Sequence, residues 1–117
     1  MKKITQDELI PYIVKVLYEY GGRATKSQVE NKIYELLASI FQHKWYHAPV
    51  SHGIPRWQHD IAWAKERARQ QHDFVKSSGR GIWKLTEGGK RYYSSPAYID
   101  GIRKIQLRIY GRGCDAT

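Results

Sequence analysis

The spacing of apolar residues changes at Phe74, and that change constrains the fold more than any other feature. In three segments between residues 6 and 68, apolar side chains recur at intervals of three and four, the spacing of amphipathic helices. From Phe74 to Thr86 they alternate instead, on both sides of the segment Ser-Ser-Gly-Arg-Gly at 77–81. Alternation around a glycine-rich segment predicts a β-hairpin. We therefore expect an α+β fold class, mainly α with a small β-hairpin.

Caps and breakers set the bounds of the expected elements. Two pairs have the spacing of a capping box: Thr5 with Glu8, and Thr25 with Gln28. They predict helices over about 6–20 and 26–41. Pro55 suits the first turn of a third helix, whose apolar residues again step by three and four. Residues 42–53, between the second and third helices, are expected to form a loop.

Two more segments follow the hairpin. We expect a helical turn from Thr86 to Tyr93, and a last helix that opens at Ser95-Pro96 and ends at the glycines near 111. The order helix, helix, helix, hairpin is that of a winged helix-turn-helix, here with an extra C-terminal helix. We expect residues 1–95 to form that DNA-binding domain. Residues 96–117 would be a C-terminal helix and tail leading to an effector domain that this chain lacks.

Composition narrows the class of protein. At 117 residues, one domain is expected. The single cysteine, Cys114, excludes an internal disulfide framework and a cysteine zinc cluster, and it fits a reducing cytoplasm. No apolar run approaches the roughly 18 residues that a membrane span requires, and the N-terminus lacks the apolar core of a signal peptide. We expect a cytoplasmic chain without a cofactor.

The charge of the chain is positive and unevenly placed. There are 20 Lys and Arg against 11 Asp and Glu, a net charge of +9. Up to residue 64 the counts are 8 and 6, whereas from residue 65 they are 12 and 5. A basic field of this kind attracts polyanions. It favours nucleic acid as the partner over an anionic membrane.

The third helix has a polar face opposite its apolar stripe. With Ile61 turned to the core, the outward residues are Arg56, His59, Trp63, Glu66, Arg67 and Gln70. Arg and Gln are the side chains that read guanine and adenine edges. Three further groups are candidates for phosphate contacts: Lys65 and Arg69 on one flank of the helix, Lys76 and Lys84 on the hairpin strands, and Arg80 at its tip. The competing interpretation is an ordinary solvated helix face.

Aromatic residues suggest a second kind of contact. Trp63 lies on the helix face that should be wet, and Trp45 and Tyr46 lie among basic residues and histidines in the 42–53 loop. With Trp57, they are candidates for a pocket that stacks on a modified base. The alternative is that these rings plug the core, because large aromatic residues usually find burial.

Metal binding and catalysis are not expected. His43, His47 and His52 have no nearby cysteine or carboxylate and match no tetrahedral zinc spacing. The carboxylates around the hairpin are dispersed and form no acidic-x-Lys triplet of a nuclease. We predict that this chain alone is not an enzyme.

Two motifs resemble a known family. Trp63-Ala64 in the third helix and Arg80-Gly-Ile-Trp-Lys-Leu-Thr-Glu-Gly-Gly89 in the hairpin look like the N-terminal winged-helix domain of Mrr-type restriction endonucleases, over about residues 5–93. The resemblance implies a DNA-targeting module, normally joined to a separate nuclease domain or subunit. Residues 69–73 (RQQHD) depart from the leucine and glycine usual before the hairpin. Related winged-helix domains bind methylated adenine, so the resemblance implies that the tryptophans contact such a base.

The charge and the order of elements predict a double-stranded DNA-binding module. The resemblance implies that it is the target-recognition domain of a modification-dependent restriction system, with methylated adenine as the base it would read. One alternative is a transcription or replication regulator that binds unmodified operator DNA. Another is a protein interaction module that docks a partner or a second copy through Ile102, Ile105 and Ile109 of the last helix.

Overall fold

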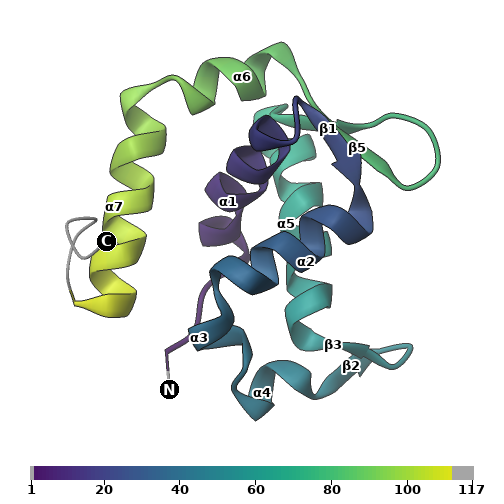
Figure 1. The fold of residues 1–117 in the computed structure, drawn as a ribbon, viewed down its shortest axis with the longest axis vertical. Helices are drawn as coiled ribbons and strands as arrows, with labels where there is room; N and C mark the ends of the chain where they lie inside the picture. Colours follow the sequence, from purple (N-terminus) through teal and green to yellow (C-terminus); the bar gives the residue numbers. More distant parts are fainter. Residues whose placement is uncertain (1, 112–117) are drawn as a thin grey trace.

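The computed structural model describes residues 2–111, so Cys114 and the predicted tail from residue 112 lie outside the described residues. The helices are α1 (Gln6–Glu19), α2 (Lys26–Leu36), α3 (Ala38–Phe41), α4 (Lys44–His47), α5 (Arg56–His72), α6 (Glu87–Tyr93) and α7 (Pro96–Tyr110). The strands are β1 (Arg23–Thr25), β2 (Pro49–Ser51), β3 (Ile54–Pro55), β4 (Val75–Ser77) and β5 (Ile82–Leu85). The described chain is mostly helical with a small antiparallel sheet, which confirms the expected α+β class (Figure 1).

The predicted hairpin forms one part of a larger sheet. Strands β4 and β5 pair antiparallel, with Lys76 opposite Lys84. Strand β1 pairs with the other edge of β5, so that the sheet order is β1-β5-β4. Sequence patterns did not predict β1 as a strand, because three residues are too few to show alternation. In the chain, β1 links α1 to α2, and in the sheet it is an edge strand.

Both predicted capping boxes are present. The Thr5 and Thr25 hydroxyls each accept a hydrogen bond from the backbone N–H three residues on, and the Glu8 and Gln28 side chains accept from the cap residues in return. Each pair satisfies two amides that a helix N-terminus leaves free. The predicted starts of α1 and α2 are therefore confirmed.

The expectation of one helix over 26–41 is wrong. The helix ends at Leu36, and Leu37 leaves helical geometry (φ −116°, ψ 27°) before α3 begins. This break turns Leu37, Ile40 and Phe41 toward the interior, where each is at most 4% exposed. Burying each of these side chains stabilises the fold by roughly 1.5–3 kcal/mol, which outweighs the gain from continuing the helix.

The expected loop at 42–53 is also more ordered than predicted. It contains the short helix α4 and the strand β2, which pairs with β3 in a second, two-stranded sheet. Its tip is His52-Gly53, both with positive φ. The hairpin runs directly into α5, so it fixes where that helix begins (Figure 1).

Helix α1 lies at the centre of the core. Its buried residues include Leu9, Ile13 and Leu17, and α5 is its main partner. Helix α7 lies on the other side of α1 from the loop that joins β4 and β5 (Figure 1). Within residues 2–111, no helix is long and apolar enough to cross a membrane.

The last helix packs inward with the residues proposed for docking. Ile105 and Ile109 are 6% and 5% exposed, and Ile102 is half-buried. Arg108 fastens the helix to α1 by donating from Nε to Glu8 Oε2 at 2.8 Å. These isoleucines already pack against the core, so they do not offer the free face that the alternative of an interaction module requires.

Candidate nucleic-acid interface

Helix α5 presents one face to the core and the opposite face to solvent. Ile61, Ala64 and Ala68 have no exposed surface, as the predicted apolar stripe requires. The helix ends at Asp73, which takes the left-handed conformation (φ 56°) that glycine usually supplies at this place. Aspartate tolerates this backbone better than most residues. The chain can then turn from α5 into β4 without the expected glycine.

Trp63 lies in the middle of the solvent face. Its side chain is 53% exposed, and its nearest aromatic neighbour is His59, with ring centroids 6.3 Å apart. Gln70 is exposed two turns further along the same face. The alternative that another segment covers Trp63 is therefore wrong within residues 2–111. An exposed tryptophan between two hydrogen-bonding side chains is a surface suited to binding.

Two sets of polar contacts hold α5 on its flanks. Buried Glu30 of α2 accepts from Gln58 Nε2 at 3.1 Å and from Lys26 Nζ at 2.7 Å. On the other flank, Gln6 of α1 donates to Asp60 at 3.3 Å. Sequence reasoning missed this positioning role of Glu30, although its spacing from Lys26 is that of an i, i+4 ion pair.

Arg67 belongs to the flank and not to the outward face. Its Nε donates to Gln6 Oε1 at 3.0 Å, and its Nη1 lies 3.2 Å from Asp7 Oδ1. Helix α1 lies beside that edge of α5 and supplies both partners, so we no longer expect Arg67 to reach a groove, although 42% of its side chain is exposed.

The other predicted cations of α5 are also engaged. Lys65 is only 8% exposed, and its ammonium donates to Ser77 Oγ at 2.8 Å. Burial lowers the pKa of Lys65, although nearby Glu66 partly opposes that shift. Lys65 is therefore not free to meet a phosphate, contrary to expectation. Arg69 is exposed and donates to Glu66 Oε2 at 2.9 Å.

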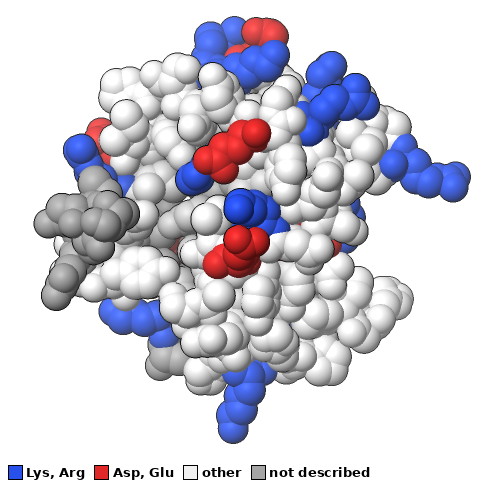
Figure 2. All heavy atoms as spheres, viewed as in Figure 1, with Lys and Arg blue, Asp and Glu red and all other residues white. Residues whose placement is uncertain are grey.

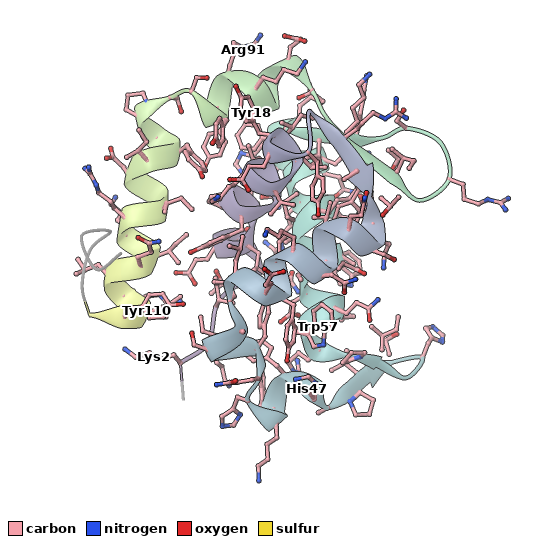
Figure 3. The ribbon with its side chains drawn as sticks, in the orientation of Figure 1. Lys2, Tyr18, His47, Trp57, Arg91 and Tyr110 are labelled. Carbon is pink, nitrogen blue, oxygen red and sulfur yellow. The ribbon has the colours of Figure 1, made fainter. Side chains whose placement is uncertain are left out.

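The four aromatic residues predicted to line a base pocket do not come together. Tyr46 is fully buried, and its hydroxyl accepts from the Ile4 amide at 2.9 Å. Trp57, labelled in Figure 3, lies near the start of α5. Its ring packs edge-on against Tyr34, with ring centroids 4.7 Å apart. The predicted pocket is therefore wrong, because these two rings complete the core around α3 and α4.

Trp45 is occupied in another way. The Lys3 ammonium and the Arg56 guanidinium lie 4.1 Å and 4.2 Å from its ring centroid. Such cation–π contacts hold the Arg56 guanidinium at the start of α5. Arg56 is thus oriented by a neighbouring ring, and Nε of Arg56 has no hydrogen-bond partner within residues 2–111.

The β4–β5 hairpin carries the remaining predicted cations. Arg80 is exposed at the tip, between Gly79 (φ 79°) and Gly81 (φ 71°). The tip is anchored where Gly81 O accepts from the Lys26 amide at 2.9 Å. Figure 2 shows Lys and Arg side chains over the region of β1 and β5 and protruding beyond the hairpin loop. Lys76 and Lys84 lie on the strands behind this tip.

Gly89, in the motif that follows the hairpin, has a packing role. A Cβ atom at this position would lie 2.2 Å from the carbonyl oxygen of Phe74. Only glycine lets α6 approach the start of β4 so closely. The glycine therefore supports the position of the hairpin.

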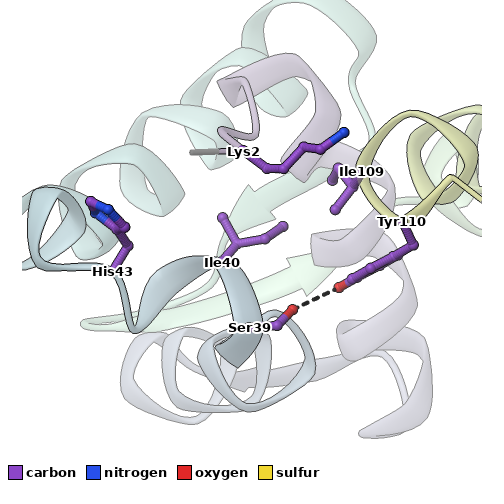
Figure 4. A pocket seen from close by; sticks show the side chains of 6 residues that line it. All are labelled: Lys2, Ser39, Ile40, His43, Ile109 and Tyr110. Atoms are coloured by element: carbon purple, nitrogen blue, oxygen red, sulfur yellow. Dashed lines mark hydrogen bonds between the residues drawn. The ribbon is translucent and has the colours of Figure 1, made fainter.

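The cavity drawn in Figure 4 lies elsewhere. It has a volume of about 310 Å³ and is lined by Lys2, Ser39, Ile40, His43, Ile109 and Tyr110. Its polar groups already have partners: the Ser39 hydroxyl lies 3.2 Å from the Tyr110 hydroxyl, and Lys2 donates to the Arg108 carbonyl of α7. None of the predicted DNA-binding residues lines it. Within residues 2–111, no cluster of three potential metal ligands occurs.

Comparison with known proteins gives no relative. No protein-family model, curated protein or solved structure matches the chain at a significant level.

Proposed function

We propose that the chain is a winged helix-turn-helix domain that binds double-stranded DNA, with α5 in the major groove and the β4–β5 hairpin as the wing. The order α1, β1, α2, α5, β4, β5 and the sheet order β1-β5-β4 support this topology. A major groove about 12 Å wide admits one α-helix. Segments α3, α4 and the β2–β3 hairpin would then be an insertion before the recognition helix.

The observation that carries the proposal is the outward face of α5. Trp63 is 53% exposed there, with His59 and Gln70 on the same face. Arg56 stands at the N-terminal end, held by Trp45. The flanks of the helix are fixed to α1 and α2, so this face is presented rigidly. Such preorganisation lowers the entropic cost of binding.

Methylated adenine remains the proposed target, read in the groove and not in a pocket. The N6 group of adenine lies at the major-groove edge, so a methyl group there would be within reach of a groove-facing ring. Trp63 is the ring that supplies this contact. Burying one methyl group against it contributes about 0.8 kcal/mol, roughly a fourfold preference.

The proposal gives this chain no catalytic step. In a modification-dependent restriction system, the cleavage would belong to a nuclease domain or subunit joined to it. The alternative function, a regulator that binds an unmodified operator, would use the same face of α5. The two functions differ in whether the protein prefers the methylated duplex.

Selection from a randomised duplex pool tests the groove contact. We expect the wild-type protein to enrich a defined site, and Trp63→Ala and Gln70→Ala to lose enrichment at one or two positions each while still binding duplex DNA. Tyr110→Ala is the matched control, since Tyr110 is a 45% exposed aromatic residue on α7. Equal enrichment by wild type and Trp63→Ala would contradict the assignment of α5 to the groove.

A further inference from the structure

Three cations lie side by side across the sheet. The pairing register places Arg23 of β1 opposite Lys84 of β5, and Lys84 opposite Lys76 of β4. Residues directly opposite in an antiparallel sheet project from the same face, with Cβ atoms roughly 4.5–5.5 Å apart. The cationic row, Arg23–Lys84–Lys76, therefore crosses the whole sheet from edge to edge.

The row occupies the outer face of the sheet. The residues next to it along the strands point the other way: Ala24, Trp83 and Leu85 are at most 6% exposed, and Val75 has no exposed surface. Ser77 is on that inner face, where its hydroxyl accepts from Lys65 of α5. The cationic row is thus directed away from α5 and from the core.

No anionic side chain balances the row within residues 2–111. The ion pairs there are made by other cations, and none of the three row residues forms an ion pair or a side-chain hydrogen bond. Figure 2 likewise shows no acidic side chain among the basic ones over β1 and β5. Like charges directly opposite each other destabilise a sheet. The arrangement costs stability to the free protein, and an anionic ligand would remove that cost.

We propose that the cationic row binds the phosphate backbone of a nucleic-acid duplex, as a contact surface separate from α5 and from the hairpin tip. The row spans two inter-strand spacings, roughly 10 Å. A duplex presents about one charge per 1.7 Å of its axis, so the row can neutralise several phosphates. The choice of a duplex rests on the proposed function, whereas the need for a polyanion rests on the row itself.

The test compares two triple variants on a 30-base-pair duplex. Arg23→Gln/Lys76→Gln/Lys84→Gln removes the row. The matched control removes three lysines that have carboxylate partners on α1, α2 and α6: Lys15→Gln/Lys32→Gln/Lys90→Gln. Both lose three charges, so they separate the row from net charge. Affinity is measured by fluorescence anisotropy at 50 to 200 mM salt.

We expect the row variant to reduce the slope of log affinity against log salt by about 2.7, at roughly 0.9 per phosphate contact. Wild-type affinity should then fall about 40-fold more than that of the row variant across this fourfold salt range. The control should keep the wild-type slope to within about one unit. Because the row is self-repelling, the Tm of the row variant should equal or exceed that of wild type, which checks that it folds.

Equal slopes in the two triple variants would overturn the proposal, as would failure of the wild-type protein to bind the duplex at 50 mM salt. The variant Trp63→Ala separates this result from the proposed function. If Trp63→Ala keeps the preference for the methylated duplex while the row variant has a reduced salt slope, the assignment of α5 to the groove fails and the phosphate contact of the row is supported.

Discussion

The replacement Tyr46→Phe distinguishes a core anchor from a base-binding ring. In the structure, the Tyr46 hydroxyl accepts from the Ile4 amide at 2.9 Å and donates to the Ile4 carbonyl at 3.4 Å. Ile4 is 3% exposed and Tyr46 is fully buried. Removing the hydroxyl leaves the Ile4 amide without a partner, because water cannot reach it. Burial also raises the pKa of the Tyr46 phenol, as expected of a hydroxyl shielded from solvent.

An unsatisfied buried amide costs about 1–3 kcal/mol. For a domain of this size, 1 kcal/mol shifts Tm by about 4 °C, so Tyr46→Phe should lower Tm by about 4–12 °C. The assay is thermal unfolding followed by circular dichroism, with Tyr110→Phe as control. The Tyr110 hydroxyl makes only an exposed contact with Ser39. Its loss should shift Tm by less than about 2 °C.

Duplex affinity of Tyr46→Phe, measured well below its Tm, should equal that of wild type. The opposite pattern, an unchanged Tm with a clear loss of affinity, would contradict this prediction, since it would place the Tyr46 hydroxyl against a ligand and not against Ile4.

Three further predictions follow from particular contacts. Arg67→Ala should lower the free energy of unfolding by up to about 1 kcal/mol without changing the salt slope of DNA binding, because its partners are on α1; a slope reduced by one unit would return it to the interface. Burial raises the pKa of Glu8, but its hydrogen bonds with Arg108 and the α1 cap outweigh burial and leave that pKa below the ordinary value. Ionised Glu8 thus stabilises the folded state above the ordinary pKa, and this contribution is lost as pH falls through the lowered pKa. Tm against pH should show Glu8→Gln less stable at pH 7, with the difference from wild type vanishing once the pH is below the lowered pKa of Glu8. Gly89→Ala should cost about 1–3 kcal/mol or more in a urea titration, since its Cβ would meet the backbone carbonyl before β4, whereas Gly101→Ala on α7 should cost nothing.

Local signals in the sequence predicted much of the fold. The capping boxes at Thr5 and Thr25 predicted the starts of two helices, and the change of period at Phe74 predicted the hairpin. These features work because they depend on hydrogen bonds and side-chain spacing within a few residues. Strand β1 and the break at Leu37 depend instead on partners far along the chain, so no local pattern could show them.

The candidate site was predicted less completely for the same reason. A helical wheel identifies the outward direction of α5 but not which neighbours lie beside its edges. Trp63 and Gln70 are exposed as the wheel indicates, whereas Arg67 and Lys65 meet α1 and β4. Arg23 could not be placed beside Lys84 without the register of the sheet.

DNA binding and the preference for methylated adenine are tested most directly by a titration of three labelled duplexes, unmodified, adenine-methylated and cytosine-modified, at two salt concentrations. We expect salt-dependent binding to all three, with the adenine-methylated duplex bound several-fold more tightly and that preference lost in Trp63→Ala. Equal binding to the three duplexes would contradict the reading of methylated adenine, and no binding at low salt would contradict DNA binding itself.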